Sequence, residues 1–175
     1  MTEAWQLAYV SLDAGTSEDE FDALIRFSQT RNRSIAIGGF LLRLGDTIFQ
    51  VMEGPSERVK TMFYDRIACD PRHGDVHVVL ERPIERVAFR GWGMVRLQAM
   101  PRLLTSLWGG VLPSQGFYRA LINDPALAEG VIRAGALLHD LAVRQGAEIV
   151  AGPHVPPLTC AGPDIPGLGP VRLGV

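Results

Sequence analysis

The chain has 175 residues, of which 47% are hydrophobic and 21% charged, and its formal net charge is −2. This composition is typical of one globular domain with a core, and no apolar run reaches the roughly 18 residues that a membrane helix needs. Clustered Lys and Arg residues are also missing, which argues against a nucleic-acid partner. Because the chain starts without a basic and an apolar signal region, we expect a cytoplasmic protein.

The first predicted elements are a strand and a helix. Residues 4–12 alternate in a way that predicts a strand that is apolar on both faces, one of which carries Trp5, Leu7, Tyr9 and Ser11. Ser17, followed three residues later by Glu20, forms a capping-box pattern. We therefore expect a helix from there to about Asn32, with Phe21, Leu24, Ile25 and Ser28 at helical spacing.

Residues 35–55 predict a β-hairpin of two central strands that turns at Gly45-Asp46 and ends at Gly54-Pro55. The pair Gly38-Gly39 inside the first of these strands needs an explanation, because glycine weakens a strand. Either a neighbouring element crowds this backbone or a ligand approaches it.

A second helix is expected from a cap at Ser56 until Asp70-Pro71, followed by strands at Val76–Leu80 and Phe89–Leu97. The predicted order is β-α-β-β-α-β-β. It indicates an α+β, ferredoxin-like sandwich: a five-stranded mixed sheet with two helices on one face and the other face bare.

Helical patterns follow from Pro101, the clearest beginning at Asp124-Pro125 and running to about Gln145. Its apolar stripe, formed by Leu127, Val131, Leu138 and Leu141, would cover the bare sheet face or a second subunit. Residues 151–175 contain 6 Pro and 5 Gly and predict a mostly disordered tail. We thus expect a domain over 1–98, a helical extension over 99–150 and a tail over 151–175.

The common catalytic motifs are missing from the sequence, so we expect no enzyme, and the cysteine and histidine spacings predict no metal site. What stands out is polar side chains in buried strands, namely Tyr9, Ser11 and Gln50. A buried amide beside a phenol and a polar ligand has two competing hydrogen-bond arrangements and could act as a switch. Alternatively, a Tyr9–Gln50 bond simply satisfies the core.

Five short segments occur together in this order: Tyr9-Val10-Ser11, Ser28-Gln29-x-x-Asn32, Phe49 to Pro55, Asp70 to His73, and Trp92-Gly93-Met94. Over about residues 5–98 the set resembles the BLUF family, the blue-light sensors that use flavin. The resemblance implies a ferredoxin-like sheet and non-covalent FAD or FMN held between the two helices.

The resemblance also implies roles for individual residues. Tyr9 would give an electron to the excited flavin, Gln50 would rearrange its hydrogen bonds, and Asn32 would bind the pyrimidine edge, although Asn32 could also be a helix cap. Further positions fall near the ring or the phosphate-bearing tail: Leu24, Ser28, Ile67, Arg66, Asp70, Arg72 and His73. Trp92 and Met94, alternate residues of the last strand, match a pair thought to move between the dark and signalling states.

Three positions depart from the family pattern. Arg31, which the resemblance places among the flavin-contacting positions beside Asn32, stands where asparagine or histidine is usual, and it would either alter the pyrimidine-edge contacts or point to solvent. Gly38 replaces a threonine and Met52 a leucine. Since neither Tyr9 nor Gln50 is touched, we expect the photochemistry to be kept and flavin affinity and recovery rate to differ.

The main hypothesis is a blue-light photoreceptor that signals through its C-terminal helices to a second subunit, as a homodimer or higher oligomer, or to a separate protein in trans. The alternative is an interaction module of the same fold that binds flavin poorly. An acylphosphatase-like hydrolase is disfavoured, because residues 13–17 offer an acid and no arginine for a phosphate-binding loop.

Overall fold

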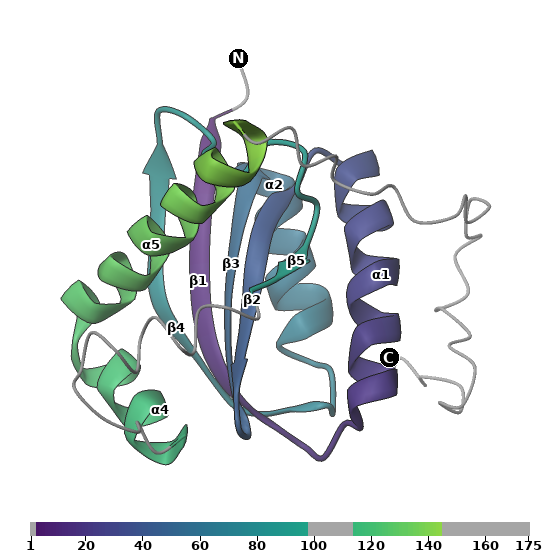
Figure 1. Cartoon of the computed structure of the whole chain (residues 1–175), viewed down its shortest axis with the longest axis vertical. Coiled ribbons are helices and arrows are strands. Elements are labelled where there is room, and N and C mark those ends of the chain that lie inside the picture. The colour runs from purple at the N-terminus through teal and green to yellow at the C-terminus, as the bar shows by residue number, and fades with distance from the viewer. Residues whose placement is uncertain (1–2, 98–113, 145–175) are drawn as a thin grey trace.

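The computed structural model describes residues 3–97 and 114–144. Five strands form one sheet in the order β4-β1-β3-β2-β5, in which β5 runs parallel to β2 and the other neighbours are antiparallel (Figure 1). The strands are β1 Ala4–Asp13, β2 Gly38–Leu44, β3 Thr47–Pro55, β4 His73–Ile84 and β5 Val95–Arg96. The predicted ferredoxin-like α+β fold is confirmed.

Helices cover both faces of the sheet. Helix α1 (Glu18–Ser34) and helix α2 (Ser56–Met62) lie on one face, and helices α4 (Ser114–Asn123) and α5 (Pro125–Arg144) lie on the other (Figure 1). Helix α1 begins as predicted, because the Ser17 hydroxyl accepts from the Glu20 backbone and the Glu20 side chain accepts from the Ser17 backbone. Its buried stripe faces the sheet.

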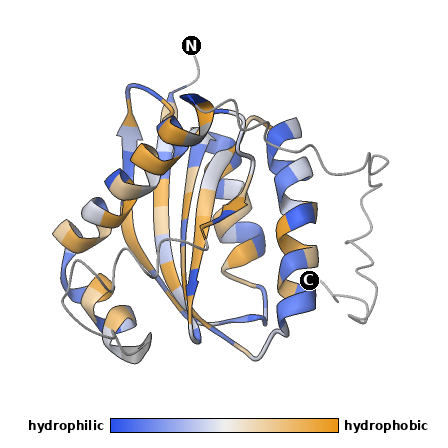
Figure 2. Cartoon of the chain, viewed as in Figure 1, coloured by the Kyte–Doolittle hydropathy of each residue, from blue (hydrophilic) through white to orange (hydrophobic). Residues whose placement is uncertain are grey.

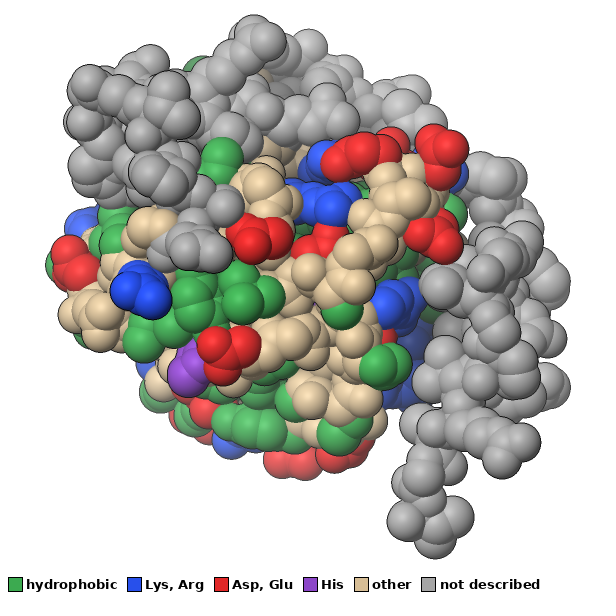
Figure 3. Space-filling model, turned by 90° about the horizontal axis from the view of Figure 1, so that it is seen from below, with side chains coloured by type: hydrophobic (Ala, Val, Ile, Leu, Met, Phe, Trp, Pro, Cys, Tyr) green, Lys and Arg blue, Asp and Glu red, His purple; other side chains and the backbone are tan. Residues whose placement is uncertain are grey.

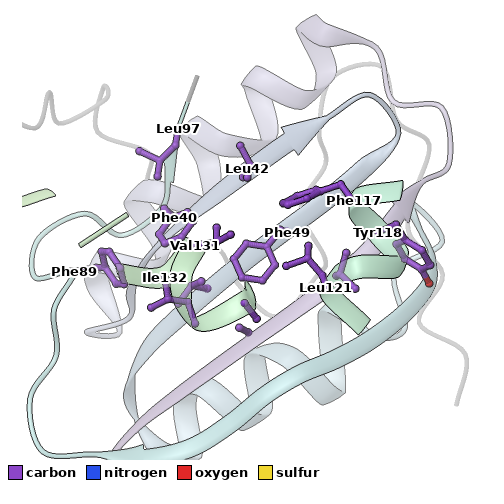
Figure 4. Packing of buried hydrophobic residues seen from close by; sticks show 14 of the residues in the cluster. Phe40, Leu42, Phe49, Phe89, Leu97, Phe117, Tyr118, Leu121, Val131 and Ile132 are labelled. Atoms are coloured by element: carbon purple, nitrogen blue, oxygen red, sulfur yellow. The ribbon is translucent and has the colours of Figure 1, made fainter. Parts of the chain in front are cut away.

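Each sheet face has its own apolar cluster, which explains why the central strands are hydrophobic along their length (Figure 2). Leu7 and Tyr9 of β1 point towards α1 and α2, whereas Ala8 and Val10 point towards α4 and α5. On the second face, aromatic rings of the strands meet Leu121, Val131 and Ile132 of the helices (Figure 4). The predicted bare face is therefore covered by the chain's own C-terminal helices.

The hairpin forms as predicted, with Gly45 at a φ of 60° in its two-residue turn. The structure also decides why Gly38 is a glycine: an added Cβ would lie 2.1 Å from the Phe89 carbonyl oxygen. At Gly39 a Cβ would lie 2.0 Å from the carbonyl oxygen of Val51. Crowding by backbone, not approach of a ligand, excludes side chains at this pair.

The second helix differs from its prediction in two ways. Its cap position is Pro55, so Ser56 is the first helical residue and not the cap. After Met62 it continues as a π-helix, η1 (Phe63–Ile67), in which the Ala68 amide donates to the Phe63 carbonyl at 2.9 Å. The regular apolar spacing of this segment predicts an ordinary α-helix and gives no sign of the wider turn, which is rare in proteins.

The last two strands are also corrected. Strand β4 extends well beyond Val76–Leu80 in both directions, whereas the expected strand Phe89–Leu97 shrinks to the two residues of β5. Gly91 and Gly93 explain the second difference, since their φ values of 80° and 56° break an extended chain. We refer to residues 85–94 as the connecting segment.

The C-terminal helices pack tightly on the sheet. Helix α5 begins where predicted, with the Asp124 carboxylate accepting from the Ala126 and Leu127 amides at 3.0 and 3.3 Å. A Cβ at Gly135 would lie 2.4 Å from the Phe40 ring, so the helix approaches β2 closely. Contrary to the predicted stripe, Leu141 is 53% exposed, because it lies on the outer face. The remaining expectations for 98–113 and for the tail lie outside the described residues.

Charged side chains of both signs are interspersed on the face shown in Figure 3. Arg96 pairs with Glu18 and Asp22, each at 2.8 Å, and Arg43 pairs with Glu18 and Asp13. Within the described part of the chain, no helix is both long and apolar enough to cross a membrane.

Candidate functional site

A cavity opens between α1 and the α2–η1 helix, over the sheet face that carries Tyr9. Helix α1 contributes residues three and four apart, such as Leu24, Ser28 and Asn32, because these share one side of a helix. The lining of the cavity comprises Thr16, Phe21, Leu24, Ile25, Phe27, Ser28, Arg31, Asn32, Leu41, Ile48, Gln50, Met62, Arg66, Ile67, Asp70, Arg72, His73 and Met94. Side chains from α1, the β2–β3 hairpin, the α2–η1 helix with the start of β4, and Met94 thus meet around one space.

The wall formed by the sheet contains a buried tyrosine–glutamine pair. Tyr9 of β1 and Gln50 of β3 are directly opposite each other in the strand register, and the phenol donates to Gln50 Oε1. Tyr9 is fully buried and Gln50 is 7% exposed. Burial raises the pKa of the Tyr9 phenol far above its ordinary value, and the negative charge of Asp70 adds to this. The phenol therefore keeps its proton at any physiological pH.

Asn32 joins the cavity to the connecting segment. It is 3% exposed, and its amide Nδ2 donates to the Gly93 carbonyl oxygen at 3.2 Å. One residue further along α1, Arg33 Nε donates to the Gly91 carbonyl oxygen at 2.7 Å. The end of α1 thus satisfies two carbonyl groups that an irregular segment would otherwise leave unpaired.

Trp92 and Met94 lie on opposite faces of the sheet. Met94 is 1% exposed and lines the cavity, whereas Trp92 is 4% exposed and packs in the cluster beneath α4 and α5. The sequence pattern treated them as alternate residues of one strand, which would share a face. That interpretation is wrong, because the positive φ of Gly93 turns the chain between them.

Several charged residues line the cavity. Arg72 Nε donates to both oxygens of Asp70, at 2.9 and 3.0 Å. Partial burial raises the pKa of Asp70, but the hydrogen bonds and charge of Arg72 outweigh it and hold that pKa below its usual range. The guanidinium groups of Arg31 and Arg66 also border the cavity.

His73 is held at the start of β4 by Ser11 of β1. The Ser11 hydroxyl and His73 Nδ1 are 2.9 Å apart, and the imidazole meets the Tyr9 ring edge-on with 5.7 Å between centroids. Burial lowers the pKa of His73. The Ser11 hydroxyl, singled out as an inward polar group, therefore has a partner in the site.

The structure brings together most of the residues that the sequence pointed to. All nine predicted flavin-contacting positions line the cavity, as do Gln50 and Met94; Tyr9 reaches it through Gln50, and Trp92 does not reach it. Sequence reasoning missed much of the apolar lining, namely Phe21, Ile25, Phe27, Leu41, Ile48 and Met62. Helical spacing to Leu24 and Ser28 could have identified Phe21 and Ile25.

The lining fits a flavin by its chemistry. Apolar side chains from two facing helices, such as Ile25 and Ile67, suit a flat ring. The amides of Asn32 and Gln50 offer donors and acceptors to a polar ring edge, and the arginines suit a phosphate.

Comparison with known proteins agrees with this fit. The photoactivated adenylate cyclase subunit beta of Euglena gracilis is 29% identical over 143 residues, which cover 71% of this chain and 16% of that protein. This chain therefore spans about a sixth of the length of that curated relative.

Solved structures give the same result. The dark-state structure of the BLUF protein BlrB has a TM-score of 0.55 at 29% identity, covering 61% of this chain and 80% of that one. The Klebsiella pneumoniae BlrP1 structure with FMN and cyclic diGMP has a TM-score of 0.53 at 30% identity. The match covers 69% of this chain and 35% of that one.

The family model described as sensors of blue light using FAD matches residues 5–95. Because the match spans more than half of the sequence, this chain belongs to the BLUF family.

Proposed function

We propose that this chain is a blue-light photoreceptor in which Tyr9 is the electron and proton donor and Gln50 is the rearranging switch. The observation that carries the proposal is the buried hydrogen bond from the Tyr9 phenol to Gln50 Oε1, at the wall of a cavity whose chemistry fits the family's flavin. Bound flavin supplies absorption of blue light and an excited state that can take up an electron.

Tyr9 must lose its proton together with its electron. Its raised pKa means that the ground-state phenol is neutral, and a phenol that has lost an electron is strongly acidic. The atom placed to take the proton is Gln50 Oε1, which already accepts the phenol hydrogen bond. Return of the electron and the proton to Tyr9 leaves no net oxidation, so the lasting change is in hydrogen bonding.

Gln50 is suited to hold that change. Its amide has a carbonyl acceptor on one side and two N–H donors on the other, and rotation exchanges them. In a buried position the two arrangements differ in energy, because every unpaired polar group there is costly. A new hydrogen bond to the flavin would shift absorption to the red.

The arginines and His73 are proposed to hold the flavin's polar side and phosphate-bearing tail. Arg31, Arg66 and Arg72 line the cavity, and guanidinium groups bind phosphate through paired N–H donors. Leu24, Ser28, Ile67 and Asp70 complete the proposed flavin contacts, whose chemistry suits FAD and FMN alike.

The output is proposed to be conformational and not enzymatic. Asn32 and Met94 link the cavity to the connecting segment, which contacts the C-terminal helices, so a partner in trans or a second copy could sense the change. Because α4 and α5 cover the sheet face, the support that remains for a dimer is the exposed outer side of α5, where Leu137 and Leu141 are 65% and 53% exposed.

The experiment is the visible absorption spectrum of purified protein in the dark and directly after blue illumination. Wild type is expected to show a flavin spectrum with a reversible red shift, and Tyr9→Phe and Gln50→Ala are expected to bind flavin without the shift. Tyr64→Phe, which alters an exposed tyrosine of η1, is the matched control and keeps it.

A red shift that survives in either Tyr9→Phe or Gln50→Ala would overturn the mechanism. A colourless protein that cannot be reconstituted with FAD or FMN would favour the interaction module. The cavity position of Arg31 is the observation that favours that second candidate, since a guanidinium there could compete with flavin contacts.

A further inference from the structure

The buried histidine of helix α5 contacts the connecting segment at its centre. His139 is 6% exposed, and its Nε2 lies 3.1 Å from the Arg90 carbonyl oxygen. A carbonyl oxygen only accepts, so Nε2 carries the proton and donates. The proposed mechanism assigns no role to this residue.

His139 also closes an aromatic group around Trp92. The imidazole meets the Trp92 ring edge-on at 4.7 Å between centroids, and the other partner, Phe89, stacks on Trp92 at 6.0 Å with an interplanar angle of 28°. Edge-to-face and offset stacked pairs of this kind are favourable beyond the area they bury. Trp92 is thus held under α5 by one ring from the helix and one from the connecting segment.

The connecting segment is held from three directions. The Glu53 carboxylate of β3 accepts the Ala88 amide at 2.6 Å, and α1 binds the carbonyl groups of Gly91 and Gly93. His139 supplies the bond at Arg90, between these two anchors. A displacement of Met94 and Gly93 at the cavity therefore acts on a chain that is tied to α5 at Arg90, next to the two carbonyl groups bound by α1.

We propose that His139 is a positioning residue that latches Trp92 and the connecting segment to α5, so that the position of Met94 in the cavity and the position of α5 are coupled. The inference rests on the proposed photoreceptor function. Because coupling between two sites is reciprocal, a change at the cavity loosens α5, and a change at His139 loosens the segment near the cavity.

The test is amide hydrogen exchange on the full chain with flavin bound, in the dark and under blue light. His139→Phe keeps a ring against Trp92 but loses the N–H donor, and His139→Gln keeps a donor. Arg133→Gln, an exposed position of the same helix, is the matched control.

In the dark, loss of one buried hydrogen bond is expected to speed exchange in residues 88–95 about tenfold in His139→Phe. In His139→Gln the exchange rates of these residues are expected to stay within about twofold of the wild-type rates. In Arg133→Gln they are expected to equal the wild-type rates. Under light, wild type is expected to exchange faster around residues 135–144, and His139→Phe to lose that light-dependent difference while keeping the red shift.

Three results would overturn the latch: an unchanged dark exchange of residues 88–95 in His139→Phe, a uniform rise across the whole sheet in that variant, or an equal light-dependent difference in α5 with and without His139. Failure of His139→Gln to restore dark exchange would also overturn the hydrogen-bonded latch. A wild type without any red shift would instead contradict the photoreceptor proposal, and the dark comparison would still test the latch.

Discussion

The two faces of the sheet are built from the same strands and differ in what they bury. Towards α4 and α5 the strands present Phe49, Val51 and their neighbours to a core of apolar side chains. Towards α1 and α2 the same strands bury Tyr9 and present Gln50, its hydrogen-bond partner, to a cavity. One strand, β3, thus carries core residues on one side and the proposed switch residue Gln50 on the other, and alternation along a strand keeps the two apart.

Buried polar groups are tolerated on the face towards α1 and α2 because the apolar core on the face towards α4 and α5 stabilises the fold. A buried phenol and amide contribute little net stability, whereas a buried aromatic ring contributes several kcal/mol. Substitutions on the two faces should therefore separate folding from the light response.

The largest expected effect is on the α5 face. Phe49→Ala should lower the free energy of unfolding by about 3–5 kcal/mol, because it leaves a cavity in an apolar core, while folded molecules keep their red shift. The neighbouring change Gln50→Ala should cost about 1–3 kcal/mol, by leaving the Tyr9 hydroxyl unpaired, and abolish the red shift. Urea denaturation measures the free energy of unfolding of both variants, and light-minus-dark difference spectra measure their red shift. Loss of the red shift in folded Phe49→Ala would break the separation of the faces.

A smaller effect is expected from two glycines of α5. Gly135→Ala forces a methyl group against the Phe40 ring and should destabilise by about 1–3 kcal/mol through overpacking. Gly130→Ala is its matched control, because nothing lies within 4 Å of an added Cβ. There the better helix propensity of alanine should stabilise by about 1 kcal/mol. Thermal unfolding of the pair checks this, and equal shifts of Tm would contradict the close approach of α5 to β2.

The smallest effect concerns pH on the cavity face. Burial lowers the pKa of His73 in the folded state, so the unfolded chain takes up a proton first as pH falls through about 6.5. Stability contributed by neutral His73 is therefore present above that pH and is lost below it, down to the folded-state pKa. Urea denaturation should show that the free energy of unfolding differs less between pH 7.5 and pH 5.5 in His73→Gln than in wild type. His77→Gln, at a histidine of the same strand, is the control for loss of a histidine. A larger pH-dependent difference in His73→Gln than in wild type would contradict this prediction.

Much of the fold follows from local pattern. The capping box at Ser17 and the turn at Gly45-Asp46 are short-range signals, and both form as predicted. The connecting segment could not be predicted, because its course depends on distant groups: Asn32 binds Gly93, Glu53 binds Ala88, and two glycines adopt positive φ. Alternation along the sequence therefore suggested a strand where long-range hydrogen bonds hold an irregular chain.

The candidate site was predicted unevenly for a similar reason. Polar residues in buried strands stand out in a sequence, so Tyr9 and Gln50 were identified from the pattern, whereas Asn32 was identified through the resemblance to the BLUF family. The apolar lining did not stand out, because Leu41, Ile48 and Met62 have the same pattern as core residues. Whether an apolar side chain faces a filled core or a cavity depends on the separation of two helices, which no local pattern records.

The π-helix η1 has a consequence for changes in chain length. Its turn accommodates one residue more than an α-helix would between the same two ends, and Arg66 and Ile67 belong to it. If the same residues formed a regular α-helix, everything beyond this turn would be rotated by about 100° relative to α2, whereas deleting one residue would restore regular α-helix without that rotation. A register change of that size would carry arginine and isoleucine away from the cavity without altering the composition of the helix. The width of one helical turn thus determines which side chains reach the flavin site.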